Sequence, residues 1–164
     1  MNNDYLGMVG DFHLLFNAPI LPTPQIPSTE RCNLRINLMQ EELNEIKEAI
    51  ENNDLVEVAD GLCDLMYVLC GSIHEFGLGE KFNELFNEVQ RSNMSKACEN
   101  EVVAQATVEH YKQKDGTESD YKEVNGKYIV YRNEDNKVLK SVNYSPANLP
   151  GIIKGVDTFN MYLD

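Results

Sequence analysis

The sequence predicts an all-α protein, a bundle of four to five helices with a small β-hairpin near the C-terminus. Apolar side chains recur at the helical period through most of the first 96 residues, and short β-like runs come only after residue 126. A chain of 164 residues with 42% apolar side chains is enough for one compact domain. We therefore predict a single domain over residues 1–164, with a helical core at about 4–96, an insertion at about 97–123, and the hairpin and tail at about 124–164.

Prolines, N-cap residues and a glycine mark the boundaries of the expected helices. A short helix over 4–17 precedes a connector that contains Pro19, Pro22, Pro24 and Pro27, which cannot be helical. Ser28 is a candidate N-cap for a helix that ends near Asn52, and Asp54 is a candidate N-cap for the next helix, which ends at Phe76 before Gly77. A fourth helix is expected at about 80–93.

The second half of the chain is less regular. Residues 99–113 are expected to be weakly helical, and 114–120 are expected to form a loop. The runs 127–132 and 137–141 predict two strands of a hairpin that turns at 133–136. The tail from Asn143 is expected to be mostly coil.

The charge balance excludes several classes of protein. There are 14 basic and 27 acidic residues, a net charge of −13, which argues against sequence-independent binding to nucleic acid. No stretch approaches the ~20 apolar residues of a membrane span, and the first thirty residues lack a signal peptide pattern. The four scattered cysteines indicate reduced thiols: Cys32, Cys63, Cys70 and Cys98. We expect a soluble, cytoplasmic protein that binds neither nucleic acid nor a membrane.

Helix phase places acidic side chains on an apolar face of the second helix. At about 100° per residue, Glu42 and Glu45 share a face with Leu34, Leu38 and Ala49. A separate stripe is wholly apolar: Ile36, Met39, Leu43, Ile46 and Ile50. Carboxylates on a partly apolar face are unfavourable unless something compensates their charge.

The third expected helix carries a sharper signal. It is apolar nearly all round, which predicts a central buried helix, yet Glu57, Asp60 and Asp64 form one stripe at i, i+3 and i+7. No basic residue follows on this helix before Lys81. Hard oxygen ligands in this number favour Mg²⁺ or Mn²⁺ over zinc.

These acidic residues also have ordinary explanations. Glu57 lies three residues after Asp54 and could close a capping box. Glu42 and Glu45 could belong to a solvated face, which is the usual fate of a charge run. Buried carboxylates seldom lack partners, so Asp60 and Asp64 are harder to explain in this way. Taken together, the acidic residues favour a metal site.

The same residues resemble a known signature. EELNE at Glu41–Glu45 followed by EVAD at Glu57–Asp60 resembles the EExxE…ExxD pattern of the all-α NTP pyrophosphatase superfamily. That superfamily includes MazG-type enzymes, dimeric dUTPases and phosphoribosyl-ATP pyrophosphohydrolases. RSNMSK at Arg91–Lys96, and KVLK with NYSPANL within Lys137–Leu149, are similar to the phosphoribosyl-ATP-pyrophosphohydrolase-like, MazG-like branch.

The resemblance implies a MazG-like helical bundle that forms a homodimer or a dimer of dimers. It implies a house-cleaning or dUTPase-like enzyme that hydrolyses a nucleoside triphosphate to monophosphate and pyrophosphate with Mg²⁺, for which Mn²⁺ could substitute. The implied Mg²⁺ ligands are Glu42, Glu45, Glu57 and Asp60. Glu41 would be a further ligand or the group that orients and deprotonates the attacking water, so the catalytic candidates are Glu41, Glu42 and Glu45.

Further residues are candidates for contacts with the substrate. Arg91, Asn93 and Lys96 could grip phosphates, although Arg91 could instead complement the dipole at the end of the fourth helix. Asp64 is a candidate for binding the substrate, and Tyr67, one turn beyond it, could flank the base or sugar, although Tyr67 could equally be a core aromatic. Lys137 and Lys140 could lean over the phosphates, although ordinary surface lysines of the hairpin are the simpler interpretation.

Two other functions fit the sequence. One keeps the fold but makes phosphoribosyl-ATP the substrate, as in histidine biosynthesis. The other is a non-enzymatic acidic helical interaction protein, which the net charge of −13 would suit.

Overall fold

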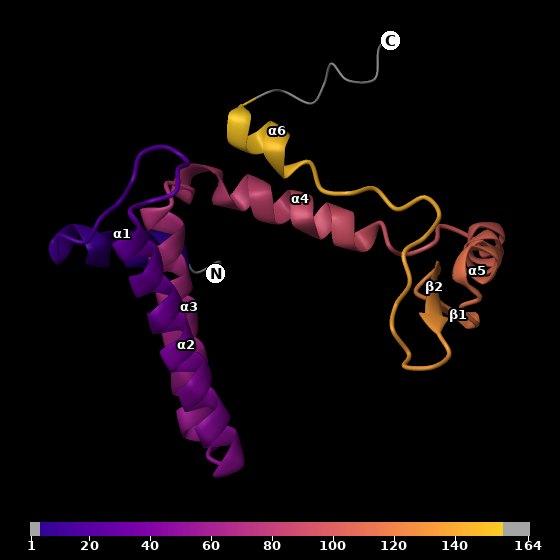
Figure 1. Ribbon diagram of the computed structural model, residues 1–164, viewed down its shortest axis with the longest axis horizontal. Coiled ribbons are helices and arrows are strands. Elements are labelled where there is room, and N and C mark those ends of the chain that lie inside the picture. Colours follow the sequence, from indigo (N-terminus) through magenta and orange to yellow (C-terminus); the bar gives the residue numbers. More distant parts are fainter. Residues whose placement is uncertain (1–3, 156–164) are drawn as a thin grey trace. The chain divides into compact units, whose positions relative to one another are not determined.

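Helices make up most of the structure, a computed structural model that describes residues 4–155 (Figure 1). In chain order the elements are α1 (Tyr5–Leu15), α2 (Thr29–Glu51), α3 (Leu55–Glu75), the 3₁₀ helix η1 (Gly79–Lys81), α4 (Phe82–Met94), α5 (Glu101–Asp115), β1 (Ser119–Val124), β2 (Lys127–Arg132) and α6 (Leu149–Lys154). The mostly helical class with a small hairpin near the C-terminus agrees with the prediction, whereas the type of bundle stays a prediction.

The chain divides into two compact units, Met1–Phe82 and Asn83–Asp164, which we describe separately. The single domain predicted over 1–164 therefore stays a prediction, and residues 156–164 of the predicted tail lie outside the described residues. No helix within residues 4–155 is long and apolar enough to cross a membrane.

In the first unit, α2 and α3 form an antiparallel helical hairpin whose ends follow the predicted caps. The Ser28 side chain accepts a hydrogen bond from the backbone of Arg31, and Asp54 accepts from Val56 N at 3.0 Å. The two helices approach closely, because a Cβ atom on Gly61 would lie 2.7 Å from Cγ1 of Ile46.

The connector between α1 and α2 is extended, as its prolines predict, and it is fixed to the end of α3. Leu21 N donates to the carbonyl of His74 at 3.0 Å, and Gln25 N donates to that of Phe76 at 3.1 Å. Gly77 has a φ of +66°, and a Cβ atom there would lie 1.9 Å from the carbonyl oxygen of Thr23. The connector therefore packs directly against the backbone of residue 77, where any side chain would collide with it.

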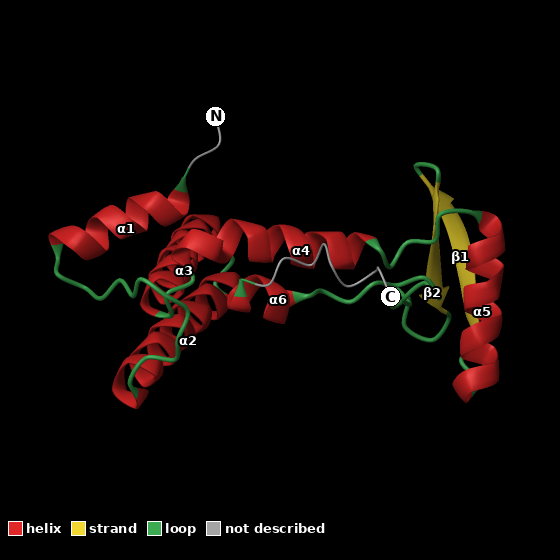
Figure 2. Ribbon diagram, turned by 90° about the horizontal axis from the view of Figure 1, so that it is seen from above, coloured by secondary structure: helices red, strands yellow, loops and turns green. Residues whose placement is uncertain are grey.

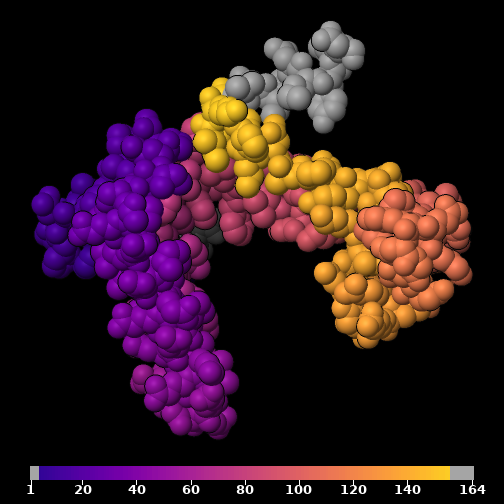
Figure 3. Space-filling model, viewed as in Figure 1, coloured from indigo at the N-terminus to yellow at the C-terminus, as the bar shows by residue number. Residues whose placement is uncertain are grey.

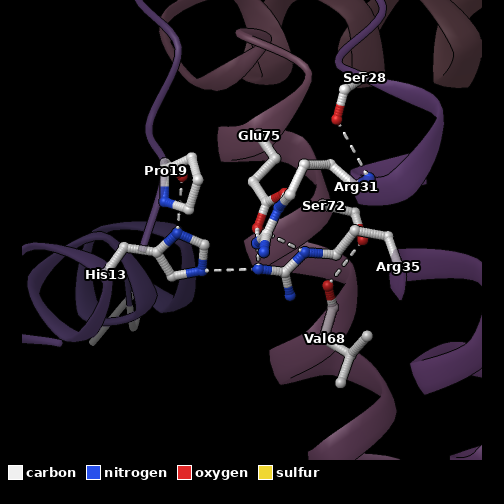
Figure 4. A network of polar contacts seen from close by, with 8 residues as sticks. All are labelled: His13, Pro19, Ser28, Arg31, Arg35, Val68, Ser72 and Glu75. Atoms are coloured by element: carbon white, nitrogen blue, oxygen red, sulfur yellow. Dashed lines mark hydrogen bonds and ion pairs between the residues drawn. The ribbon is translucent and has the colours of Figure 1, made fainter. Parts of the chain in front are cut away.

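A buried ion-pair network joins α2 to the end of α3 (Figure 4). Glu75, whose exposed fraction is 1%, accepts from Arg31 Nε at 2.9 Å and from Arg35 Nε at 2.8 Å. Nδ1 of His13 in α1 lies 2.9 Å from the carbonyl oxygen of Pro19, and its Nε2 lies 3.4 Å from a guanidinium nitrogen of Arg35. This network fixes α1 and the start of the connector to the helical hairpin.

The prediction that residues 55–76 form a helix buried on all sides is wrong for the first half of α3. Leu55 is 79% exposed, and Leu62 and Met66 are also exposed. Within its unit α3 packs on α2 and α1, so two neighbours cannot cover its whole surface. On the face drawn in Figure 3, no other segment of the first unit covers the hairpin near its turn.

Most of the apolar stripe of α2 is exposed for the same reason, although Met39 and Ile46 are half-buried. Ile36, Leu43 and Ile50, spaced by seven residues, are exposed, and Leu43 and Ile50 have exposed fractions of 48% and 62%. The buried positions of α2 are instead Arg35 and Ala49, on the face that also carries Glu42.

The second unit contains the hairpin, but with a different partner strand from the predicted one (Figure 2). β2 pairs with β1, and the turn is Asn125-Gly126, where both residues have positive φ. The prediction of a loop at 114–120 is therefore wrong at its end, where β1 begins at Ser119. Residues 137–141 form no strand, although Tyr131 and Val138 make an isolated antiparallel bridge.

A small core lies between α5 and this hairpin. It is built from Cys98, Ala104, Val130 and Leu139. α5 confirms the helix expected at 99–113, whereas α6 interrupts the tail that was expected to be coil.

Candidate active site

Glu42 is the centre of an acidic group on the α2–α3 hairpin. It is half-buried, and within residues 4–155 its buried Oε2 has no hydrogen-bond partner. Burial raises the pKa of Glu42, and the negative charges of Glu45, Asp64, Glu41 and Asp60 raise it further. The negative charges of carboxylates on both helices thus act on Glu42, whose buried oxygen atom has no donor.

The other acidic side chains are more exposed to solvent than predicted. Asp60 and Asp64 are exposed, so the expectation that both are buried is wrong for the single chain. Their helix positions put them on the same stripe, but the first half of α3 has too few neighbours to cover that stripe. Glu41 and Glu45 are exposed as well.

Glu57 lies at the first turn of α3 and is not among the charges that shift the pKa of Glu42. Asp54 Oδ1 accepts from the backbone N–H of Glu57 at 3.2 Å, which is one half of the capping box considered above. The other half would need the backbone N–H of Asp54, and that group donates to the carbonyl of Ala49 at 2.9 Å. The side chain of Glu57 is therefore not required as a cap.

The donor set fits a hard divalent cation in chemistry. Carboxylate oxygens are what Mg²⁺ and Mn²⁺ prefer, and an unpartnered buried carboxylate oxygen is costly unless a cation or donor meets it. Within residues 4–155, no three His, Cys, Asp or Glu side chains are arranged to hold a metal ion. Like charges repel, so these carboxylates would need to move together to share a cation.

Tyr67 follows Asp64 by one turn of α3 and lines an apolar cavity of about 340 Å³. The cavity lies between α1 and α3, and its walls are formed by Tyr5, Met8, Val9, Leu62, Cys63, Met66, Tyr67 and Cys70. The Tyr67 ring meets the ring of Phe12 edge-on, with centroids 5.5 Å apart. Tyr67 is thus a partly exposed wall residue, not a fully enclosed core aromatic.

The predicted phosphate-gripping residues lie in the second unit. Arg91 makes two hydrogen bonds to Glu88, at 2.7 and 2.8 Å, which with a bond from the Asn148 backbone lower the pKa of Glu88 to about 2. Lys96 Nζ donates to Asn93 Oδ1 at 2.8 Å. Arg91 is thus engaged by a carboxylate in addition to its place near the end of α4.

Comparison with known proteins decides the family. Residues 9–93 match the family model described as phosphoribosyl-ATP pyrophosphohydrolase, which is more than half of the chain. The chain belongs to the phosphoribosyl-ATP pyrophosphohydrolase family. This family is part of the MazG-like all-α NTP pyrophosphatase superfamily, as the acidic signature suggested.

An uncharacterized protein of Acanthamoeba polyphaga mimivirus is similar to almost the whole chain. The two are 28% identical over 169 aligned residues, which cover 91% of this chain and 67% of the viral protein. The similarity therefore extends beyond the segment that matches the phosphoribosyl-ATP pyrophosphohydrolase family.

The family match contains every acidic candidate, together with Arg91 and Asn93, and ends before Lys96. It supports a pyrophosphohydrolase that acts on phosphorus-containing anhydrides of nucleotides. Neither His13 nor the pairing of Arg35 with Glu75 was predicted from the sequence. The position of Arg35 on the partly apolar face of α2 could have indicated such a pair, because a buried guanidinium requires an acidic partner.

Proposed function

We propose that this chain is a Mg²⁺-dependent nucleoside triphosphate pyrophosphohydrolase that acts on dUTP-like or other non-standard nucleotides. The observation that carries the proposal is the buried, unpartnered oxygen of Glu42, surrounded by carboxylates from two helices. The chain belongs to a pyrophosphohydrolase family, which supports a role for these acidic residues in the hydrolysis of a phosphoanhydride bond.

In this proposal Glu42, Glu45, Glu57 and Asp60 hold Mg²⁺, for which Mn²⁺ can substitute. A bound divalent cation would neutralise and align the phosphates, and would invert the repulsive field that the acidic group presents to a triphosphate. Glu57 is included among the proposed ligands because its side chain is not needed to cap α3.

Glu41 is the proposed base, next in sequence to Glu42 and exposed to water. It takes a proton from a water molecule whose oxygen forms a new bond to the α-phosphorus. The bond between that phosphorus and the bridging oxygen breaks, and pyrophosphate leaves with the electron pair. Positioning and charge neutralisation account for most of the catalysis in phosphoryl transfer, so no covalent intermediate is required.

The apolar cavity beside Tyr67 gives the substrate's base or sugar a place in this proposal. Asp64, one turn before Tyr67 on α3, is a further proposed substrate contact. Aromatic and apolar walls with a few polar groups are typical of small-molecule sites. Arg91, Asn93 and Lys96 would supply the contacts to phosphates.

The exposed apolar surface of the hairpin supports a homodimer or a dimer of dimers. Leu43, Ile50, Leu62 and Met66 are exposed, and exposed apolar patches of this kind mark interaction surfaces.

The test is pyrophosphate release from a panel of ribo- and deoxynucleoside triphosphates and from phosphoribosyl-ATP, with Mg²⁺ and with a chelator. We expect release with Mg²⁺ only, and a loss of at least about a hundredfold in Glu45→Gln and Asp60→Asn. Glu48→Gln is the matched control, because Glu48 lies on the same helix and is exposed.

Two results would contradict the proposal. Full turnover in both Glu45→Gln and Asp60→Asn would show that the acidic group is not the catalytic centre. Binding of a basic protein without metal-dependent affinity for nucleotides would instead identify an interaction protein. If phosphoribosyl-ATP is hydrolysed in preference to every nucleoside triphosphate, the proposed reaction is right and the proposed substrate is wrong.

A further inference from the structure

Two histidines lie between α1 and α3, each against a glycine of the other helix. A Cβ atom on Gly71 of α3 would lie 2.8 Å from Nε2 of His13. A Cβ atom on Gly10 of α1 would lie 3.2 Å from Nε2 of His74. His13 is 3% exposed, and the centroids of the two imidazole rings are 5.7 Å apart. Each imidazole therefore lies directly on the backbone of the opposite helix.

The partners of His13 fix its protonation state. Nδ1 lies 2.9 Å from the carbonyl oxygen of Pro19, and Nε2 lies 3.4 Å from Nη2 of Arg35 (Figure 4). A carbonyl oxygen only accepts hydrogen bonds and a guanidinium only donates them, so Nδ1 carries the hydrogen and Nε2 is bare. The neutral imidazole satisfies both contacts. A second proton, on Nε2, would point at an N–H of Arg35.

The surroundings of His13 oppose that second proton. From α2 the ring is faced by Arg35, and from α3 by His74 and Glu75, whereas the connector at 16–28 contains no charged residue. Burial lowers the pKa of His13 below its ordinary value of 6.5, and the charges of Arg35 and His74 lower it further. The hydrogen bond to Pro19 and the charge of Glu75 oppose this shift without reversing it. The packed position of the ring therefore favours its neutral form.

The hold of the hairpin on α1 depends strongly on these contacts. Of the eleven residues of α1, Val9, Gly10 and His13 are buried. Besides the contacts of His13, Nε2 of His74 donates to the carbonyl of Leu6 at 2.8 Å. A helix of this length is marginal in water without tertiary packing. The α2–α3 hairpin, in contrast, has its own helix packing and the buried ion pairs between its two helices.

We propose that a proton on Nε2 of His13 releases α1 from the α2–α3 hairpin. Repulsion by Arg35 and the cost of a buried charge drive the charged ring into water. Release removes the wall that Tyr5, Met8 and Val9 form in the apolar cavity. The first unit thus keeps its cavity covered at neutral pH and uncovers it in weak acid. This inference goes beyond the proposed function and does not depend on it.

Hydrogen exchange of the full chain, followed by mass spectrometry and corrected for the intrinsic rate at each pH, tests the release. The released form takes up a proton that the packed form resists, so release becomes easier as the pH falls below the ordinary pKa of histidine, 6.5. Between about pH 7.5 and about pH 5.5, we expect the protection of α1 to fall by up to about tenfold. The α2–α3 hairpin and α5 are internal references and should change by less than about twofold.

His13→Gln is the informative variant. Its amide can donate to the Pro19 carbonyl and accept from Arg35, but it does not take up a proton in this pH range. We expect the protection of α1 in this variant to be independent of pH. His110→Gln is the matched control, because His110 is the exposed member of the chain's three histidines and lies in α5. This control should keep the pH dependence of the wild-type protein.

Three results would overturn the proposal. They are a change in wild-type α1 no larger than that of the references, the same pH dependence in His13→Gln as in the wild-type protein, and a loss of protection in the hairpin together with α1. If α1 of His13→Gln is unprotected at both pH values, an NMR titration of the wild-type imidazoles decides. The release of α1 must then follow the protonation of His13, and release at another pH overturns the proposal.

The outcome is separate from that of the proposed function. These measurements use neither a nucleotide nor a metal ion, and His13 lies outside the acidic group that is proposed to hold Mg²⁺. Pyrophosphohydrolase activity without release of α1 would overturn this inference alone, and release of α1 in an inactive protein would overturn the proposed function alone.

Discussion

Replacement of Glu75 by glutamine should destabilise the first unit severely. The carboxylate is 1% exposed and accepts hydrogen bonds from both Arg31 and Arg35, so its removal leaves a guanidinium group buried without a counter-charge. Breaking a buried ion pair from one side costs about 3–5 kcal/mol. The lower part of that range is expected, because Arg31 is one-third exposed and can turn to water, whereas Arg35 cannot.

Denaturant unfolding followed by circular dichroism measures this loss. Glu51→Gln is the control, because Glu51 pairs with Lys47 on the surface of α2 at 3.8 Å, and such an exposed pair contributes less than about 1 kcal/mol. Addition of Arg35→Met to Glu75→Gln should recover part of the loss by removing the orphaned charge. Equal unfolding free energies for Glu75→Gln and Glu51→Gln would refute the reasoning, and so would a double variant no more stable than Glu75→Gln.

The pH dependence of this network has a definite sign. Burial alone would raise the pKa of Glu75, but the hydrogen bonds and charges of Arg31 and Arg35 outweigh it and lower the pKa below its ordinary value of 4.5. A carboxyl with a lowered pKa in the folded state stabilises the fold above its unfolded pKa. The stabilisation is lost as the pH falls through the lowered pKa, and Glu75→Gln should abolish this component.

Three further predictions follow from the packing. Glu42→Gln should stabilise the metal-free protein at neutral pH while abolishing turnover, because it removes a negative charge that burial and the neighbouring carboxylates disfavour. Since the pKa of Glu42 is raised, the gain in unfolding free energy should vanish in acid below about pH 4.5. Gly71→Ala should lower the melting temperature and cost about 1–3 kcal/mol, because its Cβ would lie 2.9 Å from Arg35 Nη1, and an unchanged value would contradict the close packing. If the proposed dimer forms through this surface, Ile50→Lys should yield a monomer in light scattering, whereas Glu48→Gln should leave the mass of the wild-type protein unchanged.

The elements with strong local signals could be predicted from the sequence. Ser28 and Asp54 each cap the helix assigned to them, and the four prolines keep their connector extended. The partner of β2 was missed because the run 119–124 carries four polar or charged residues on a weakly apolar strand. The Asn125-Gly126 dipeptide was the available signal, since it favours the two positive φ angles of a tight hairpin.

The candidate site shows where helix phase stops being informative. Helix phase correctly distinguishes the face of α2 that carries Glu42 from the apolar stripe that carries Leu43. It does not predict how exposed the residues of either face are. An apolar face has the same driving force to be buried whether its partner is another helix of the chain or a second copy. For this reason the sequence alone could not show that Asp60 is exposed in the single chain.

The contact between Gly77 and Thr23 has a consequence for sequence variation. Loops ordinarily accept substitutions and changes of length more readily than the elements they connect. The proline connector has little such freedom, because any side chain at position 77 would collide with the Thr23 carbonyl and the amides of Leu21 and Gln25 are bound to the end of α3. In a saturation mutagenesis library, this irregular segment should therefore be depleted of insertions and of non-glycine codons at position 77 as strongly as a hydrophobic core.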